Sequence, residues 1–297
     1  MTATKIVSLC PTFARPWMVA NTLAQWVDQT HPIEQRHILV GDDTDGPGEL
    51  STTRLRNAVR NARQHIGQAD ELAKTVHYFR FPSGLSLPQK YNAMAEYALQ
   101  WVCPQADLFT VWEDDDTYLP AHLQQLAHDW NRRNRPTGWW GHPKLVWSDY
   151  SLEAKTEQAQ GRFHAALALS VDAWKRSPWI ETKSPDFDQQ FLARLQAAFG
   201  GRKEYDLHVA KKSGNTYSTP TYMFRWHTRC PHGQQFMGDH GHDWQQVARA
   251  AMRKEFEDRR GYDFTCQKDL RTTELIQSVT DFGKHRVCIP QYLPEVG

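Results

Sequence analysis

Four consecutive acids follow a stretch of strand-forming residues in "FTVWEDDDTYLP" (109–120), and we call these four residues the acid cluster. They are Glu113, Asp114, Asp115 and Asp116. Each adjacent pair of like charges costs about 1–4 kcal/mol, depending on the local dielectric. A hard cation such as Mg²⁺ or Mn²⁺ offsets this repulsion, because it takes oxygen ligands from carboxylates and phosphates. The alternative is a solvated helix start, where acids favour the helix dipole; we favour the metal site.

Two further polar groups follow predicted strands. A short apolar strand is predicted over 5–10, and it leads into Pro11 and Thr12. A second predicted strand ends in the acids Asp42 and Asp43. In parallel α/β sheets, ligands bind outside the carboxyl ends of the strands. We therefore expect these residues and the acid cluster to converge on one crevice.

The elements that must position these residues alternate along the first 130 residues. Apolar runs typical of strands are separated by amphipathic patterns of 3–4 spacing, which predict helices. This alternation predicts an α/β fold with a central, mostly parallel mixed sheet flanked by helices. The predicted strands span 5–10, 36–43, 75–81 and 107–112, and the predicted helices span 16–30, 52–65, 86–102 and 116–130.

The pattern changes after residue 135, where aromatic residues become frequent. A helix is predicted over 184–199, and "TYMFRWHTRCPHG" (221–233) predicts a strand that leads into a histidine-rich loop. We expect one domain over 1–240, made of a first half (1–125) and a second half (126–240). Residues 241–297 are expected to form a helical C-terminal extension packed on it.

The composition narrows the classes of function. The 35 Lys and Arg residues nearly balance the 34 Asp and Glu residues, which gives no general argument for binding nucleic acid or an anionic membrane. The beginning lacks a signal-peptide pattern, and no stretch approaches the roughly 20 apolar residues of a membrane helix. Five scattered cysteines indicate reduced thiols. We expect a cytoplasmic protein without membrane insertion.

Four segments of the first 125 residues, in the order given at the end of this paragraph, resemble the nucleotide-sugar half of family-two glycosyltransferases. These enzymes have the A-type glycosyltransferase fold. The resemblance covers about residues 5–125 and continues more loosely to about 235. It implies a single Rossmann-like domain that moves a sugar from a nucleoside-diphosphate sugar, a UDP-sugar, to an acceptor hydroxyl with inversion. The segments are "SLCPTFARPWMVANTLAQWVDQTHP", "ILVGDDTDG", "GLSLPQKYNAM" and "VWEDDDTYLPAHL".

The resemblance implies donor-binding roles for residues of the first three segments. Pro11, Thr12 and Arg15 would border the base and ribose, and Asp42 and Asp43 would bind one or the other. The pair Lys90 and Asn92 stands where the family commonly has an Arg–Asn pair, so it would contact the diphosphate. Lysine in place of the arginine is a departure from the family pattern.

The acid cluster stands in the place of the family's DxD motif. Alignment on the following Tyr and Pro puts Glu113 at the first acid and Asp115 at the second, with Asp115 as the metal ligand for Mn²⁺ or Mg²⁺. Glutamate at the first position departs from the family, and Asp114 with Asp116 has the same spacing. Glu113 and Asp114 are expected to contact the donor.

Inversion requires a base near the acceptor hydroxyl. The family has an acid shortly before an Arg–Leu pair, and in "DFDQQFLARL" this spacing favours Asp188. Asp186 is the alternative base, or the N-cap of the helix.

A histidine completes the metal shell in the family, and the matching segment here offers His232, with His227 as an alternative. Imidazole together with carboxylates suits Mn²⁺ better than Mg²⁺. A zinc site formed by His227, Cys230 and His232 is a further alternative, although its spacing matches no common structural pattern.

The acceptor is a glycan or, as a second hypothesis, a hydroxymethylated DNA base. In that case the stretch "RKEFEDRR" (253–260) and Arg132, Arg133 and Arg135 would meet the DNA phosphates. Two other functions stay open at this point: a metal-dependent nucleotidyl or phosphoryl transferase, and a non-catalytic protein that binds a nucleotide sugar or a glycan. Three tryptophans lie where the family builds its acceptor side, and they either stack on a ligand or pack in the core: Trp139, Trp140 and Trp147.

Overall fold

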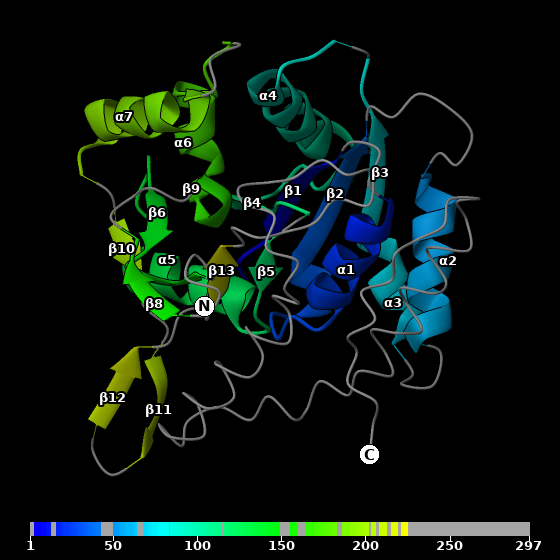
Figure 1. The fold of residues 1–297 in the computed structure, drawn as a ribbon, viewed down its shortest axis with the longest axis horizontal. Coiled ribbons are helices and arrows are strands. Elements are labelled where there is room, and N and C mark those ends of the chain that lie inside the picture. Colours follow the sequence, from blue (N-terminus) through cyan, green and yellow to red (C-terminus); the bar gives the residue numbers. More distant parts are fainter. Residues whose placement is uncertain are drawn as a thin grey trace.

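A seven-stranded sheet forms the centre of the molecule, with the strand order β10-β6-β9-β4-β1-β2-β3 (Figure 1). Its strands are β1 (Ile6–Thr12), β2 (Arg36–Asp42), β3 (Val76–Arg80), β4 (Leu108–Val111), β6 (Trp140–Pro143), β9 (Ala168–Ser170) and β10 (Lys203–Tyr205). The structure is a computed structural model. It describes residues 3–12, 16–42, 50–63, 68–82, 84–114, 116–148, 155–159, 164–182, 186–201, 203–205, 208–212, 215–218 and 221–224.

The central sheet is mixed and mostly parallel. β1 pairs in parallel with β2 and β4, β2 with β3, and β6 with β10. β9 is antiparallel to both β4 and β6. The predicted α/β class with a mixed central sheet and flanking helices is confirmed.

The helices follow the strands along the chain. Apolar residues of α1 and α4 join the same core as β1, β2 and β4, whose residues are almost all buried. Near-continuous apolar runs are typical of parallel strands covered on both faces. The helices are α1 (Pro16–Val27), α2 (Thr52–Arg63), α3 (Ala69–Lys74), α4 (Leu87–Tyr97), α5 (His122–Arg132), α6 (Val171–Arg176) and α7 (Phe187–Phe199).

Two smaller sheets complete the described strands. A four-stranded sheet has the order β5-β13-β7-β8, and a hairpin is formed by β11 and β12. The hairpin extends away from the central sheet (Figure 1). The strands are β5 (Thr117–Tyr118), β13 (Tyr222–Phe224), β7 (Leu145–Ser148), β8 (Lys155–Gln158), β11 (His208–Lys212) and β12 (Asn215–Ser218).

Several predicted boundaries are wrong, and pairing between distant segments explains the largest error. The helix predicted from residue 116 begins only at His122, because Thr117 and Tyr118 pair with β13 as the short strand β5. The strand predicted to end before Pro11 continues to Thr12. The short helix α3 was not predicted, and the helix predicted over 86–102 changes to a π-helical turn at Ala98–Val102.

Within the described ranges, none of the helices has the length and apolar character needed to cross a membrane. The predicted extension, 241–297, lies outside the described residues, so the domain boundary at residue 240 stays a prediction.

Candidate functional site

The carboxyl ends of β1, β2 and β4 meet at one edge of the central sheet. Thr12 is the register partner of Asp42 at the ends of β1 and β2. After β4, the Trp112 backbone N–H donates to the carbonyl of Leu9 at 2.9 Å, which keeps the chain beside β1. The Thr12 hydroxyl then donates to Oδ2 of Asp114 at 2.5 Å. The described members of the three polar groups therefore meet at one edge of the sheet, and the crevice stays a prediction.

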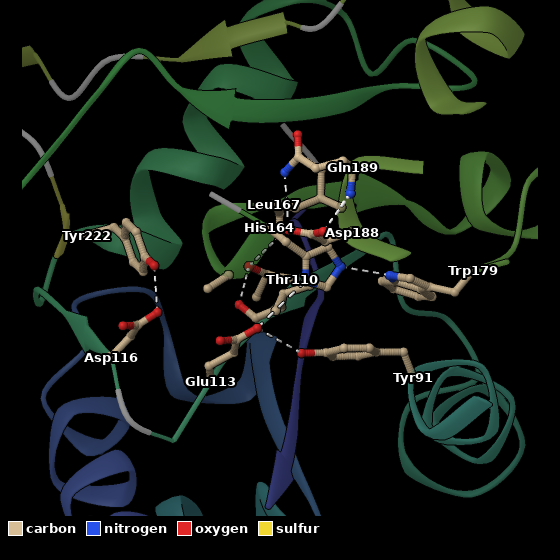
Figure 2. Close-up of polar contacts among 12 residues, drawn as sticks. Tyr91, Thr110, Glu113, Asp116, His164, Leu167, Trp179, Asp188, Gln189 and Tyr222 are labelled. Atoms are coloured by element: carbon tan, nitrogen blue, oxygen red, sulfur yellow. Dashed lines mark hydrogen bonds and ion pairs between the residues drawn. The ribbon is translucent and has the colours of Figure 1, made fainter. Parts of the chain in front are cut away.

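Two members of the acid cluster are buried and bonded to the protein itself. Asp114 is 1% exposed and Asp116 is 2% exposed. Oδ2 of Asp116 accepts a hydrogen bond from the Tyr222 hydroxyl at 2.5 Å (Figure 2). These carboxylates therefore contribute to the connection between β1, the acid cluster and β13.

Burial raises the pKa of the Tyr222 hydroxyl well above its usual value, and the neighbouring Asp116 carboxylate raises it further. Both effects disfavour a second negative charge at this position. The phenol therefore stays protonated at neutral pH and serves as a donor to Asp116.

Glu113 has a different environment, because its side chain is 29% exposed. Its Oε1 atom accepts a hydrogen bond from the Tyr91 hydroxyl at 3.4 Å and lies 3.7 Å from Nδ1 of His164 (Figure 2). Its backbone N–H donates to the Tyr118 hydroxyl at 2.8 Å, and that hydroxyl donates to the carbonyl of Ala165 at 2.9 Å. The backbone of Glu113 is thus held while its side chain stays partly exposed.

These environments bear on which two acids of the cluster meet a ligand. Asp114 and Asp116 are enclosed by protein, whereas the side chain of Glu113 is partly exposed. This favours the register of Glu113 with Asp115 over that of Asp114 with Asp116. Asp115 lies outside the described residues. The predicted contact of Asp114 with the donor is untested and stays a prediction.

His164 is a site residue that the sequence did not single out. It begins the short 3-10 helix His164–Ala166 and is buried. Its Nε2 accepts a hydrogen bond from the indole N–H of Trp179 at 2.9 Å. Its ring packs edge-on against Tyr91, with 5.2 Å between the ring centroids. The local sequence "GRFHAALALS" contains no motif that would have identified this residue.

Asn92 and Lys90 project from α4. The Asn92 amide donates to the carbonyl of Trp179 at 2.8 Å, and its oxygen accepts from the Trp179 N–H at 3.0 Å and from the Trp174 indole at 3.2 Å. Nζ of Lys90 lies 5.6 Å from the centroid of the Phe81 ring. The diphosphate role of this pair stays a prediction, and for Asn92 it competes with three hydrogen bonds inside the protein.

Asp188 lies in the first turn of α7 and is partly exposed. Its carboxylate accepts hydrogen bonds from the backbone N–H and the side-chain amide of Gln189, at 2.7 and 3.1 Å. Asp186 occupies the N-cap position, but its side chain makes no capping hydrogen bond, and its Oδ1 accepts instead from the Gln190 side chain at 3.0 Å. In the view of Figure 2, Asp188 and Glu113 lie on either side of His164.

The oxygen chemistry of Glu113 fits a hard cation, but the described residues do not complete a metal site. Among them, no group of three His, Cys, Asp or Glu residues could hold a metal ion. The remaining predicted site residues fall outside the described ranges: Arg15, Asp43, Asp115 and His232. The residues named in the alternatives to His232, which are His227 and Cys230, lie outside them as well.

The residues considered for the acceptor are engaged within the protein where the structure describes them. Trp139 and Trp140 are buried, so both belong to the core. Arg132 and Arg133 both bond to Asp129, at 3.0 and 2.7 Å. Nε of Arg135 donates to Oδ1 of Asn131 at 2.7 Å. The three arginines thus bond to residues at the end of α5. The side chain of Trp147 lies outside the described part of the chain.

No protein-family model matches the sequence, and no curated protein matches it. The chain is similar in fold to solved structures of S. aureus TarS and of a mannosyltransferase. One is TarS 1–349 in complex with UDP, with 11% identity, a TM-score of 0.48, and coverage of 94% of this chain and 82% of that one.

A longer TarS structure has 10% identity and a TM-score of 0.47, and the match covers 90% of this chain but only 42% of that one. The mannosyltransferase PcManGT from Pyrobaculum calidifontis, in complex with GDP-Man and Mn²⁺, has 13% identity and a TM-score of 0.49, covering 95% of this chain and 74% of that one. These values assign neither an activity nor a ligand to this chain.

Proposed function

We propose that this protein is a metal-dependent, inverting glycosyltransferase that moves a sugar from a UDP-sugar to an acceptor hydroxyl. One observation carries the proposal most. At the carboxyl edge of the sheet, the side chain of Glu113 is partly exposed, while its neighbours Asp114 and Asp116 are buried and bonded to the protein. An accessible acid at this edge is where an α/β sheet places its ligand contacts.

On the donor side, Glu113, Asp115 and His232 would hold Mn²⁺ or Mg²⁺. When bound, the cation offsets the negative charge that develops on the leaving diphosphate. Lys90 would add a positive charge near the same phosphates. The base and ribose would lie along the edge formed by Pro11, Thr12, Arg15, Asp42 and Asp43.

On the acceptor side, Asp188 would take the proton of the attacking hydroxyl. The acceptor oxygen bonds to the anomeric carbon as the bond from that carbon to the diphosphate breaks, which inverts the configuration. Partial exposure of Asp188 in the first turn of α7 supports this role. Phe187, its neighbour in sequence, packs on His164 with 5.4 Å between ring centroids. Asp186 is the alternative base.

The first experiment measures Mn²⁺-dependent transfer and hydrolysis of UDP-sugars, with UDP-GlcNAc first and GDP-Man as a second donor, because the similar structures contain these ligands or their parts. We expect Asp115→Ala to abolish turnover. We expect Asp188→Asn to keep UDP binding but to lower transfer by about 10²–10⁴-fold, the usual contribution of a general base. Asp70→Asn, an exposed acid on α3 that pairs with Arg60, serves as the control.

Each other function gives its own result in this experiment. Transfer that survives in Asp188→Asn removes that residue from the mechanism. Nucleotide release without sugar specificity indicates a nucleotidyl or phosphoryl transferase. Binding of the donor without any turnover indicates a non-catalytic binding protein.

We propose a glycan as the acceptor and the cytoplasm as the location. The DNA hypothesis drew on the stretch "RKEFEDRR" (253–260), which lies outside the described residues, and on Arg132, Arg133 and Arg135, which bond to Asp129 and Asn131. A gel shift at low salt with plain and hydroxymethylated duplexes tests it, because phosphate contacts weaken steeply as salt rises. Salt-sensitive binding of the modified duplex would favour DNA over the glycan.

A further inference from the structure

We propose that His164 is a positioning residue that holds the Glu113 carboxylate in the orientation needed for the donor. The inference rests on the proposed function in one respect, namely that Glu113 faces the metal and nucleotide. It begins from a juxtaposition: the imidazole of His164 lies between the indole of Trp179 and the carboxylate of Glu113 (Figure 2).

The contact with Trp179 determines which nitrogen of His164 carries the proton. An indole N–H only donates, so Nε2 of His164, 2.9 Å away, must accept. In the neutral ring the proton therefore resides on Nδ1, the atom that faces Glu113.

Trp179 is itself held in place on several sides. Both of its backbone polar groups bond to Asn92, and its ring is fully buried. The ring stacks on Tyr91 and on Phe191, with centroid distances of 5.0 and 4.8 Å. Because Trp179 is fixed, the His164 ring cannot turn over without losing its hydrogen bond.

The Nδ1–H group is a buried donor without a hydrogen-bond acceptor among the described residues. Oε1 of Glu113 lies 3.7 Å from this nitrogen. A buried donor that lacks an acceptor costs about 1–3 kcal/mol. A displacement of Glu113 by less than about 1 Å would give an ordinary hydrogen bond, since these are about 2.7–3.2 Å long.

Both donors near Glu113 face the same oxygen. The Tyr91 hydroxyl and His164 Nδ1 lie 3.4 and 3.7 Å from Oε1. Among the described residues, none forms a hydrogen bond or ion pair with Oε2, so this oxygen is left to a ligand. Hydrogen bonds to one oxygen of a carboxylate commonly orient the other toward a metal, and their loss costs 10–100-fold in affinity.

The same histidine also contacts the helix of the proposed base. Its ring packs edge-on against Phe187 and Phe191 of α7, with centroid distances of 5.4 and 6.3 Å. His164 therefore touches both the residue that would bind the donor and the helix that carries Asp188. His164 is therefore placed where it can fix the position of the Glu113 carboxylate relative to Asp188.

Two substitutions separate positioning from packing. In His164→Asn the amide nitrogen takes the place of Nδ1, so the donor to Glu113 is kept and the acceptor for Trp179 is lost. In His164→Gln the side-chain oxygen reaches the place of Nε2, so the acceptor is kept and the donor is lost. His128→Gln, an exposed histidine on α5, controls for the chemical change.

The measurements are the Kd for UDP with Mn²⁺, the ratio of KM to kcat for the donor, and the unfolding free energy of each variant. We expect His164→Gln to weaken UDP binding by about tenfold or more and to act mainly through KM, as the loss of an orienting hydrogen bond does. We expect His164→Asn to bind within about threefold of wild type even though it loses the Trp179 hydrogen bond. Equal or greater loss in His164→Asn would overturn the proposal.

A spectroscopic readout tests the geometry independently of activity. Long-range ¹H–¹⁵N spectra of ¹⁵N-histidine protein, with His164 assigned by the signal lost in His164→Gln, should show a protonated Nδ1 and a bare Nε2. The Nδ1 signal should shift in Glu113→Gln. A proton on Nε2, or no shift in Glu113→Gln, would overturn the proposal. If wild type binds no nucleotide with Mn²⁺, the proposed function fails, while this spectrum still decides the arrangement around His164.

Discussion

At the residue scale, adjacent acids after β4 occupy opposite environments. The side chain of Glu113 is 29% exposed, whereas Asp114 and Asp116 are enclosed and each accept a hydrogen bond from a hydroxyl group at 2.5 Å. The sequence located the acid cluster but left its register open. The partner of Asp116 is Tyr222, which is 106 residues away, and no local pattern reveals such a contact.

The Tyr222→Phe substitution tests the structural role of Asp116. It removes the hydroxyl that donates to a buried carboxylate, and hydrogen bonds to charged groups contribute about 1.5–3 kcal/mol. We expect the free energy of unfolding to fall by that amount in urea titrations at neutral pH. Tyr97→Phe is the matched control, since the Tyr97 ring packs on Phe79 and no described residue bonds to its hydroxyl. Equal stability of the two variants would contradict the assignment.

At the element scale, β2, β3 and α4 come unusually close together beside the site. A Cβ atom added at Gly41 would lie 2.5 Å from Cζ of Phe81 and 3.0 Å from Sδ of Met94. Gly41 directly precedes Asp42, so this contact helps to fix the end of β2. The alternation of patterns predicted β1 to β4 and most helices. It missed β5 and the antiparallel direction of β9, because both depend on pairing with segments far along the chain.

Gly41→Ala should therefore destabilise the protein. Inserting a methyl group into a filled core typically costs about 1–3 kcal/mol, because neighbours must leave their preferred positions. Gly201→Ala is the control, since an added Cβ there would meet nothing within 4 Å. Urea unfolding of both variants measures the difference, and a Gly41→Ala protein as stable as the Gly201→Ala protein would refute the close approach.

At the scale of the whole molecule, several histidines are held neutral by burial. Burial lowers the pKa of His122 to about 3. It also lowers the pKa of His77 to about 3 and that of His37 to about 4, and nearby positive groups lower these two pKa values further. Their usual pKa is near 6.5, so the unfolded chain binds more protons than the folded one between these values. Stability is then complete above about pH 6.5 and is lost as the pH falls toward 3.

His122→Asn isolates the share of one histidine in this loss. The ring of His122 is buried, and its Nδ1 lies 3.0 Å from the Thr221 hydroxyl, a contact that the Asn amide can replace. Between about pH 6 and 4, the slope of unfolding free energy against pH should be about 1.4 kcal/mol per unit smaller than in wild type. Between pH 7.5 and 8.5 the slopes should coincide, and parallel curves at acidic pH would contradict the prediction.

The central proposal also concerns the whole molecule: three strand ends form one edge, at which Glu113 and Asp115 would bind a cation and a nucleoside diphosphate. Calorimetric titration of UDP, with Mn²⁺ and then with EDTA, tests this most directly. We predict binding that requires Mn²⁺, that weakens by about tenfold or more in Glu113→Gln and in Asp115→Asn, and that is unchanged in Asp70→Asn. Equal affinity in EDTA, or full affinity in both acid-cluster variants, would contradict the account.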